Sequence, residues 1–286
     1  MIVVVRGEPG YPAALEALPR PPEKLWVDGQ LPSGPLVSVV GTRAPDREGR
    51  AFARELGAAL ARAGAGVLSG GALGIDAAAH QGALDAAGGT VAVLGTGIDV
   101  AYPREHADLY RAISRSGALV SELTPGMPPR RAHFPERNRI VAALGVATIV
   151  VQAGFRSGAL STAAIARRLG RPVIAVPWGP GHRCGEGTGR LVEAGAIAGC
   201  SLGGILRAAG LRERANRSPI ESASSRERSE EARTILRALD DGPLYLSEIS
   251  DETGLPAEVV VRTILTMTLE RLVDEVDFQR FACRRP

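Results

Sequence analysis

The side chains best suited to contact a charged polymer lie together in the middle of the sequence. Residues 130–139 hold four arginines, one phenylalanine and one asparagine. Arginine binds a phosphate group with two parallel hydrogen bonds, and an aromatic ring offers a face on which a nucleobase stacks. These residue types favour a site for single-stranded nucleic acid. By residue type alone, a solvated helix start with Phe134 in the core is an equally good interpretation.

The same segment leads into a predicted helix. Pro135 suits its first turn, because the missing N–H of proline would have no partner there. At about 100° per residue, three apolar residues share the buried side: Ile140, Ala143 and Leu144. Asn138 and Arg139 fall on the opposite, polar side, and Arg137 falls near the apolar stripe. We therefore expect Arg137 to be paired or to line a cleft.

Short turns of small residues follow several apolar runs and open helices. Ten residues in them are candidates for phosphate contact: Gly41, Thr42, Ser69, Gly70, Gly71, Gly95, Thr96, Gly97, Ser157 and Gly158. In a parallel sheet such turns share the carboxyl edge, where free N–H groups and helix dipoles favour anions. The alternative is that they serve only close packing of strand against helix. The Gly-x-Gly-x-x-Gly fingerprint is absent after the first buried run and Walker A is absent, so we expect no bound NAD, ATP or other cofactor.

The remaining titratable residues do not assemble an active site. The four histidines are far apart, and none has the spacing of a metal-ligand pair. Asp76 and Glu122 lie near strand ends and could form an acid–base pair, but capping a helix or pairing with an arginine is the favoured interpretation. No Gly-x-Ser-x-Gly nucleophile motif occurs. The sequence therefore favours a protein that is not an enzyme and holds no metal.

Apolar runs alternate with helical stretches through most of the chain. Six candidate strands are nearly continuous in Val, Ile, Leu and Ala, as in strands buried on both faces of a parallel sheet: Leu36–Gly41, Ala65–Ser69, Thr90–Gly95, Ala118–Leu123, Ala147–Ala153 and Pro172–Pro177. The expected helices are Arg47–Ala63, Ile75–Ala87, Pro103–Ser116, Glu136–Leu144, Leu160–Leu169 and Arg190–Ala194. This alternation predicts an α/β fold, an extended Rossmann-like parallel sheet flanked by helices.

Composition divides the chain into four parts. Residues 1–35 form a short lead-in, rich in Pro and Gly, with a helix expected at 12–18 and too few residues for a core of its own. The Rossmann-like core is expected at 36–206, and the polar stretch 207–228 is typical of a linker. Residues 229–286 show helix, short helix, turn, helix and small hairpin, the pattern of a winged helix-turn-helix domain.

Charge separates the last part from the rest. Residues 229–286 carry seven arginines against twelve Asp and Glu residues, a net charge of −5, whereas the remainder carries a net charge of +8. DNA phosphates repel an acidic surface. We therefore expect the last part to act in protein interaction or regulation instead of DNA binding.

Composition also limits the class of protein and the cellular compartment that we expect. The hydrophobic content of 45% and the charged content of 23% exclude a disordered or fibrous chain. No apolar run approaches the roughly 20 residues of a membrane span, and the charge of Arg6 follows the apolar start, the wrong order for a signal peptide. The three cysteines lack Cys-x-x-Cys spacing, which predicts neither disulfides nor a zinc site. A cytoplasmic protein with no membrane contact is expected.

An ordered set of motifs covers about residues 11–200. It includes Val39-Val40-Gly41-Thr42-Arg43, Gly74-Ile75-Asp76-Ala77-Ala78-Ala79-His80, Leu94-Gly95-Thr96-Gly97-x-Asp99-x-x-Tyr102-Pro103, His133-Phe134-Pro135-x-Arg137-Asn138-Arg139 and Arg156-Ser157-Gly158-x-Leu160. Together these motifs resemble the DNA-processing protein A family (DprA, also called Smf). One such motif would be a weak signal, whereas the ordered set is specific.

The resemblance implies a DNA-binding protein instead of a catalyst. Family members bind single-stranded DNA in natural transformation, protect incoming strands, help to load the RecA recombinase and form homodimers through the Rossmann-like domain. The DNA pocket that the resemblance implies uses Arg43, Arg131 and Phe134, and the run Arg137-Asn138-Arg139 belongs to the same wall. The C-terminal part resembles the winged-helix domain that some members carry.

Two positions depart from the family pattern, and two other functions stay open. Leu73 stands where the family usually has Arg, and Gly189 where it has Asn, which puts contacts at that edge of the pocket in doubt. The first alternative is a nucleotide-processing enzyme similar to the lysine-decarboxylase-like phosphoribohydrolases, but their Pro-Gly-Gly-x-Gly-Thr-x-x-Glu motif is absent. The second is a regulator of duplex DNA that acts through the C-terminal part, which its acidity disfavours.

Overall fold

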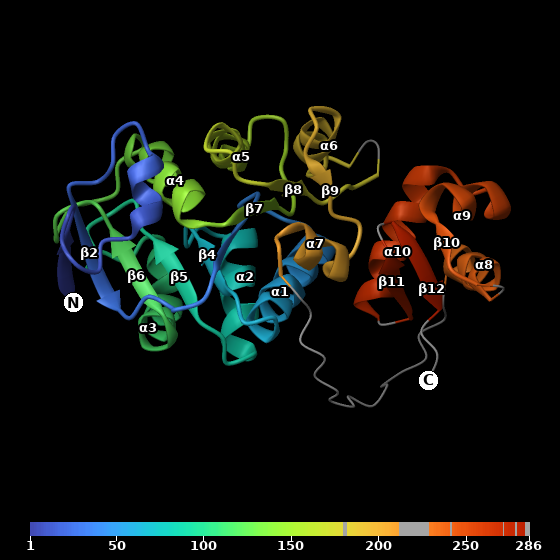
Figure 1. Cartoon of the computed structure of the whole chain (residues 1–286), viewed down its shortest axis with the longest axis horizontal. Coiled ribbons are helices and arrows are strands. Elements are labelled where there is room, and N and C mark those ends of the chain that lie inside the picture. Colours follow the sequence, from blue (N-terminus) through green and yellow to red (C-terminus); the bar gives the residue numbers. More distant parts are fainter. Residues whose placement is uncertain (180–181, 212–228, 241, 271, 278, 284–286) are drawn as a thin grey trace.

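The structure is a computed structural model that describes residues 1–179, 182–211, 229–240, 242–270, 272–277 and 279–283. Most of the linker expected at 207–228 therefore lies outside the described residues. The described part forms one large sheet with helices on both faces and a small C-terminal unit of helices and strands (Figure 1).

The large sheet has the strand order β1-β2-β6-β5-β4-β3-β7-β8-β9 among the described residues. Its parallel strands are β3 (Leu36–Val40), β4 (Gly66–Ser69), β5 (Thr90–Val93), β6 (Ala118–Ser121), β7 (Ala147–Val150), β8 (Val173–Ala175) and β9 (Ile197–Ala198). The strands β4, β5, β6 and β7 are buried along their whole length. This burial on both faces explains their continuous apolar sequences and confirms the predicted α/β fold.

Helices cover the sheet on both sides. The helices α1 (Arg47–Arg62), α2 (Ile75–Asp85) and α3 (Ala107–Ser116) lie on one face. On the other face lie α4 (His133–Leu144), α5 (Gly158–Arg168) and α6 (Glu186–Glu193) (Figure 1). The expected helix at Pro103–Ser116 begins instead as a separate 3-10 turn, η2 (Arg104–His106). The sixth helix begins at Glu186, four residues before the expected start.

The lead-in segment is part of the large sheet, which corrects the prediction for residues 1–35. The strand β1 (Ile2–Val5) pairs antiparallel with β2 (Lys24–Gly29), and β2 pairs antiparallel with β6. Between them, the expected helix is the 3-10 helix η1 (Ala13–Ala17). Neither strand has the continuous apolar sequence of a buried parallel strand. The strand β1 is mostly exposed, and β2 alternates buried with partly buried residues beside Pro-rich turns.

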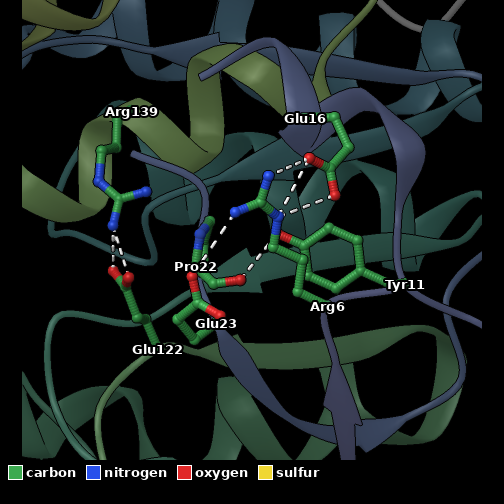
Figure 2. Close-up of polar contacts among 7 residues, drawn as sticks. All are labelled: Arg6, Tyr11, Glu16, Pro22, Glu23, Glu122 and Arg139. Carbon is green, nitrogen blue, oxygen red and sulfur yellow. Dashed lines mark hydrogen bonds and ion pairs between the residues drawn. The ribbon is translucent and has the colours of Figure 1, made fainter. Parts of the chain in front are cut away.

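Polar contacts close the lead-in against itself (Figure 2). The guanidinium of Arg6 donates to the carboxylate of Glu16, with an Nη2–Oε2 distance of 2.7 Å. The hydroxyl of Tyr11 donates to the carbonyl of Pro22 at 2.8 Å. Leu15 and Leu25 are fully or almost fully buried in the same cluster as β5 and β6 residues. The lead-in therefore folds as one end of the core.

The core also continues past its expected end. The helix α7 (Leu202–Ala208) packs Ile205 and Leu206 into the cluster that contains residues of β3 and α1. Leu211 belongs to the same cluster. Apolar packing thus extends at least five residues into the stretch expected as linker, to Leu211.

The C-terminal unit contains α8 (Glu230–Leu239), β10 (Leu244–Tyr245), α9 (Leu246–Thr253), α10 (Ala257–Leu269), β11 (Val273–Asp277) and β12 (Arg280–Cys283). The hairpin β11–β12 was expected, and β10 joins it to give the sheet order β10-β12-β11. Ile235, Ile264 and Phe281 fill its own apolar cluster. The unit contacts the core through α7 and β11, where Arg207 Nη2 lies 3.1 Å from Glu275 Oε2.

Within the described residues, no helix combines the length and the apolar character needed to cross a bilayer.

Candidate nucleic-acid interface

The strand order places a crevice at the middle of the sheet. From β3 the chain proceeds through β4, β5 and β6 in one direction, and then returns to β7 on the other side of β3. The connections that follow β3 and β7 therefore diverge to opposite faces, and ligands of open α/β sheets bind outside the carboxyl ends of strands at such a point. The two connections are joined, because the amide of Thr42 donates to the carbonyl of Gln152 at 2.7 Å.

A hollow opens at this carboxyl edge, beside the ends of β3, β4 and β5. Its lining includes Arg43, Leu73, Tyr102, Phe134 and Arg137. The cavity volume is about 60 Å³, against the roughly 300–1,000 Å³ of a pocket that encloses a small molecule. The hollow is therefore too small to enclose a nucleotide.

Arg43 and Phe134 meet at the hollow, although 91 positions separate them in the sequence. The guanidinium carbon of Arg43 lies 5.5 Å from the centre of the Phe134 ring, within the range of a cation–π contact. Arg43 is exposed and Phe134 is partly exposed. Phe134 is therefore not sealed in the core, and the alternative interpretation of this residue is excluded.

Tyr102 is a second aromatic residue at the hollow that the sequence analysis did not select. Its ring centre lies 5.5 Å from that of Phe134, at an interplanar angle of 38°. Tyr102 is 43% exposed, an unusual amount for a large aromatic residue beside a hollow. The scarcity of aromatics, 4% of the chain, together with the Tyr102-Pro103 motif, is the signal that could have identified it.

Arg137 is buried and organises the edge. Its guanidinium donates to the carbonyls of Gly70 and Val93, which follow β4 and end β5. A Cβ at Gly70 would lie 2.4 Å from this guanidinium, so only glycine allows the side chain to pass. Burial lowers the pKa of Arg137, and the nearby Asp76 opposes that effect. The structure confirms that Arg137 lines a cleft, and its contact with DNA stays a prediction.

The neighbours of Arg137 differ in availability. Arg139 donates to both carboxylate oxygens of Glu122, at 2.5 and 2.6 Å (Figure 2). Its charge is therefore neutralised, which confirms the pairing favoured for Glu122, and the place of Arg139 in the wall of the DNA pocket stays a prediction. Asn138 is partly exposed and lies 3.5 Å, through Nδ2, from the carbonyl of Gly158. Arg131 is exposed and forms no ion pair or hydrogen bond with any described residue.

Most of the glycine turns hold the edge together instead of presenting free donors. The hydroxyls of Ser69 and Thr96 donate to the carbonyls of Val39 and Val100. Further amides that the sequence offered as anion donors are already bonded within the protein, namely those of Thr42, Gly70, Gly97 and Ser157. A Cβ at Gly41 would lie only 2.5 Å from the Ile75 side chain, and a Cβ at Gly95 only 2.8 Å from the Phe134 ring. These positions therefore support the close-packing alternative, whereas at Gly158 a Cβ would meet open space.

Asp76 and His80 lie on α2, the helix that follows the turn after β4, and both are buried. Asp76 Oδ2 accepts hydrogen bonds from the amides of Gly70 and Ala72. Burial raises the pKa of Asp76, and Arg137 and these amides partly offset it. The hydroxyl proton of Thr90 goes to Val67, so His80 Nδ1 is the donor to Thr90, at 2.7 Å. Burial lowers the pKa of His80 to about 3 and keeps it neutral. Both residues have structural roles.

A second polar cluster supports the Arg43 turn from the other side. Asp46 caps α1 by accepting from the amide of Gly49, and it also binds Gln152 and His182. Burial would raise the pKa of Asp46, but these hydrogen bonds outweigh it and lower the pKa. Across the described residues, no three His, Cys, Asp or Glu side chains are grouped as a metal site.

The sequence profile of the family described as DNA recombination-mediator protein A matches residues 2–209. A putative DNA processing protein DprA of Mycobacterium tuberculosis is 43% identical over 226 residues, which cover 78% of this chain. The match spans 58% of the length of that relative. The C-terminal unit lies outside the residues that the family profile matches.

Two solved structures share this fold. The X-ray structure of DNA processing protein A from Streptococcus pneumoniae is 36% identical, with a TM-score of 0.66 over 69% of this chain and 70% of that chain. The protein of the same name from Helicobacter pylori, described with a single-stranded DNA binding mode, is 30% identical. Its TM-score is 0.63 over 68% of this chain and 91% of that chain.

Proposed function

Because the chain belongs to the DNA recombination-mediator protein A family, we propose that it binds single-stranded DNA at the carboxyl edge of the sheet, as a recombination mediator and without catalysis. The observation that carries this proposal is the exposed guanidinium of Arg43 above the ring of Phe134. An unpaired base has a free face to stack on this ring, whereas a base inside a duplex does not. Arg43 and Arg131 form no ion pair with any described residue, so their charges are available to phosphates.

The shape and contents of the hollow support binding over catalysis. Its small volume leaves no room to enclose a substrate. The titratable residues Asp76 and His80 of α2 do not line the hollow, and both are buried and bonded to the protein itself. The proposal therefore includes no cofactor, no metal and no chemical step.

The wider role follows from the family. We propose that the protein protects incoming single strands and helps to load RecA in natural transformation, as a homodimer formed through the Rossmann-like domain in the cytoplasm. For the C-terminal unit we propose a winged-helix domain that contacts a protein partner. Its element order and its net charge of −5 support this assignment, because an acidic surface repels DNA.

A gel-shift series tests the proposal directly. The whole chain is titrated against an oligo-dT and a duplex of equal length at two salt concentrations. We expect preference for the single strand and an affinity that falls with salt, with a slope of about −0.7 per phosphate contacted. Release of free base from nucleoside monophosphates would favour the enzyme alternative instead.

Three variants test the pocket: Arg43→Ala, Arg131→Ala and Phe134→Ala. Each should weaken oligo-dT binding, because each removes a charge or a stacking face. The control is Arg115→Ala, which removes one charge from the exposed last turn of α3, ahead of β6 and thus at the opposite edge of the sheet. If all three pocket variants bind like the parent, the pocket assignment is wrong.

A further inference from the structure

A second arginine-stacked aromatic residue lies on the other side of the crevice. Phe155 follows β7 and is 50% exposed. The guanidinium carbon of Arg190, from α6, lies 4.1 Å from the centre of its ring. Single exposed apolar residues are common on protein surfaces and need no explanation alone. Here the exposed ring is held by a cation from a different element.

The charge of Arg190 is not neutralised by an acidic side chain of the described residues. Glu186 precedes it by four residues on α6, yet no ion pair or hydrogen bond joins Arg190 to any described residue. Arg156 and Arg183 lie in the adjoining segments, and both are exposed without a described polar partner. The surroundings of Phe155 are therefore basic, as are those of Phe134, and suit a phosphate backbone.

The backbone beside the ring is open. A Cβ built at Gly158 or Gly189 would meet nothing within 4 Å, and one at Gly154 would meet only the carbonyl of Arg183, at 3.5 Å. Gly189 is one of the two positions that depart from the family pattern, and it directly precedes Arg190. The absence of a side chain at Gly189 leaves room for a flat group beside the Arg190–Phe155 pair.

The two aromatic positions are connected along one surface. Phe134 and Asn138 are one helical turn apart on α4, where side chains lie about 5–6 Å apart. Asn138 reaches the carbonyl of Gly158, at the first turn of α5, three residues beyond Phe155. The connections after β3 and β7 are also joined by the hydrogen bond from Thr42 to Gln152. A strand that leaves Phe134 along α4 therefore meets the start of α5 and then Phe155.

We propose that Phe155 and Arg190 form a second base-stacking position for the same DNA strand, which crosses the crevice from the β5 side to the β7 side of the sheet. This inference rests on the proposed function, because it assigns more of the same polynucleotide to a second subsite. Phe134 and Arg43 hold one nucleotide, and Phe155 and Arg190 hold another further along. The second position adds affinity only when the strand is long enough to reach both.

The affinities for a short and a long oligonucleotide distinguish the contribution of the Phe155 position from that of the Phe134 position. Oligo-dT of about 4 and about 16 nucleotides, the range of common single-strand site sizes, is titrated by fluorescence anisotropy. Phe155→Ala and Arg190→Ala should each bind the long oligomer about five- to tenfold more weakly than the parent and the short one equally well, since one stacked base contributes at least about 1 kcal/mol. Phe155→Tyr keeps a ring and should bind like the parent. Phe134→Ala should weaken both lengths.

Tyr245→Ala is the matched control, because it removes an arginine-stacked ring from the acidic unit. Oligomers with 2-aminopurine at successive positions give an independent measurement. The parent should quench the 2-aminopurine fluorescence at two separated positions, and Phe155→Ala should quench it at only one of them. Parental affinity of Phe155→Ala for the long oligomer, or equal weakening at both lengths, would overturn the second position while the function stands. A parent that binds neither oligomer would refute the function as well.

Discussion

The core and the C-terminal unit each contain an arginine stacked on an aromatic ring at the same distance. In the core, Arg43 lies 5.5 Å from the ring centre of Phe134, and in the C-terminal unit Arg280 lies 5.5 Å from that of Tyr245. The guanidinium of Arg280 also donates to the carbonyl of Pro243, and the unit around it has a net charge of −5. The guanidinium of Arg43 has no described hydrogen-bond partner and faces a basic edge. The same local geometry thus gives different chemistry, because charge and free donors decide what binds.

The difference extends to the helices of the two regions. The helix α4 begins at the open hollow, with Arg131 just before it. The helix α10, which would enter a DNA groove in a winged helix, packs Leu265 and Leu269 against the core cluster. Its exposed Arg262 is accompanied by Glu258. The packing and the charge of α10 therefore agree with the protein-contact role proposed for the C-terminal unit.

Removal of Arg137 should have the largest effect, confined to the core. Arg137→Ala leaves the carbonyls of Gly70 and Val93 without their donor and removes a buried cation near Asp76. We expect a loss of about 3–5 kcal/mol in the free energy of unfolding, measured by urea denaturation. Arg139→Ala, two residues away, is the control and should lose less than Arg137→Ala, because Arg139 and its partner Glu122 are both partly exposed. Similar losses for both variants would show that Arg137 does not organise the edge.

Lowering the pH from 7 to 5 should destabilise the core through its buried histidine His80, and all four histidines precede residue 229. The pKa of His80 is about 3 in the folded core against an ordinary 6.5. The unfolded chain therefore binds the proton more readily, and the stabilisation that is complete above pH 6.5 is lost as the pH falls towards 3. Protonation of His80 lowers the free energy of unfolding by at most about 1.4 kcal/mol per pH unit.

Urea unfolding at pH 7 and at pH 5 measures this dependence. The variant His80→Asn has no titrating ring, so it should lose less stability than the parent between the two pH values. Equal pH dependence in both proteins would mean that His80 is not the acid-sensitive group.

The two stacked rings themselves give a direct comparison in DNA binding. Phe134→Ala should weaken oligo-dT binding by about 1–3 kcal/mol, the contribution of one stacked base. Tyr245→Ala should change the affinity by less than about twofold, since its surroundings are acidic. Titration by fluorescence anisotropy at fixed salt measures both. A comparable loss for Tyr245→Ala would place the DNA on both regions and contradict the proposed role of the C-terminal unit.

The smallest expected effect concerns the contact between the two regions. The side chain of Glu275 is 4% exposed and accepts from Ser201 and from Arg207. Arg207→Ala should cost about 0.5–1.5 kcal/mol, because Ser201 still satisfies the carboxylate. Thermal unfolding measures the loss, and oligo-dT affinity should stay unchanged. A change in that affinity would show that the docking of the C-terminal unit influences the DNA edge.

The sequence by itself determined the α/β core and most of its element boundaries. Buried parallel strands such as β4 and β5 need apolar residues on both faces, and that requirement is local enough to be visible in each segment. The position of Arg137 near an apolar stripe likewise predicted that it would line a cleft. Residue type and order also led to the family, and through it to Arg43, Arg131 and Phe134.

Only the tertiary structure decided which charges are free. Arg139 is neutralised by Glu122, which lies 17 positions earlier in the connection after β6, whereas Arg131 has no partner among the described residues. The strand β2 joined the sheet for a similar reason, since its partner β6 is remote in sequence, and β1 joined it by pairing with β2. The contacts of Arg43 with Phe134 and of Arg190 with Phe155 also depend on segments that approach only in the folded chain. Ion pairing, stacking and strand pairing act between neighbours in space, so sequence periodicity carries little information about them.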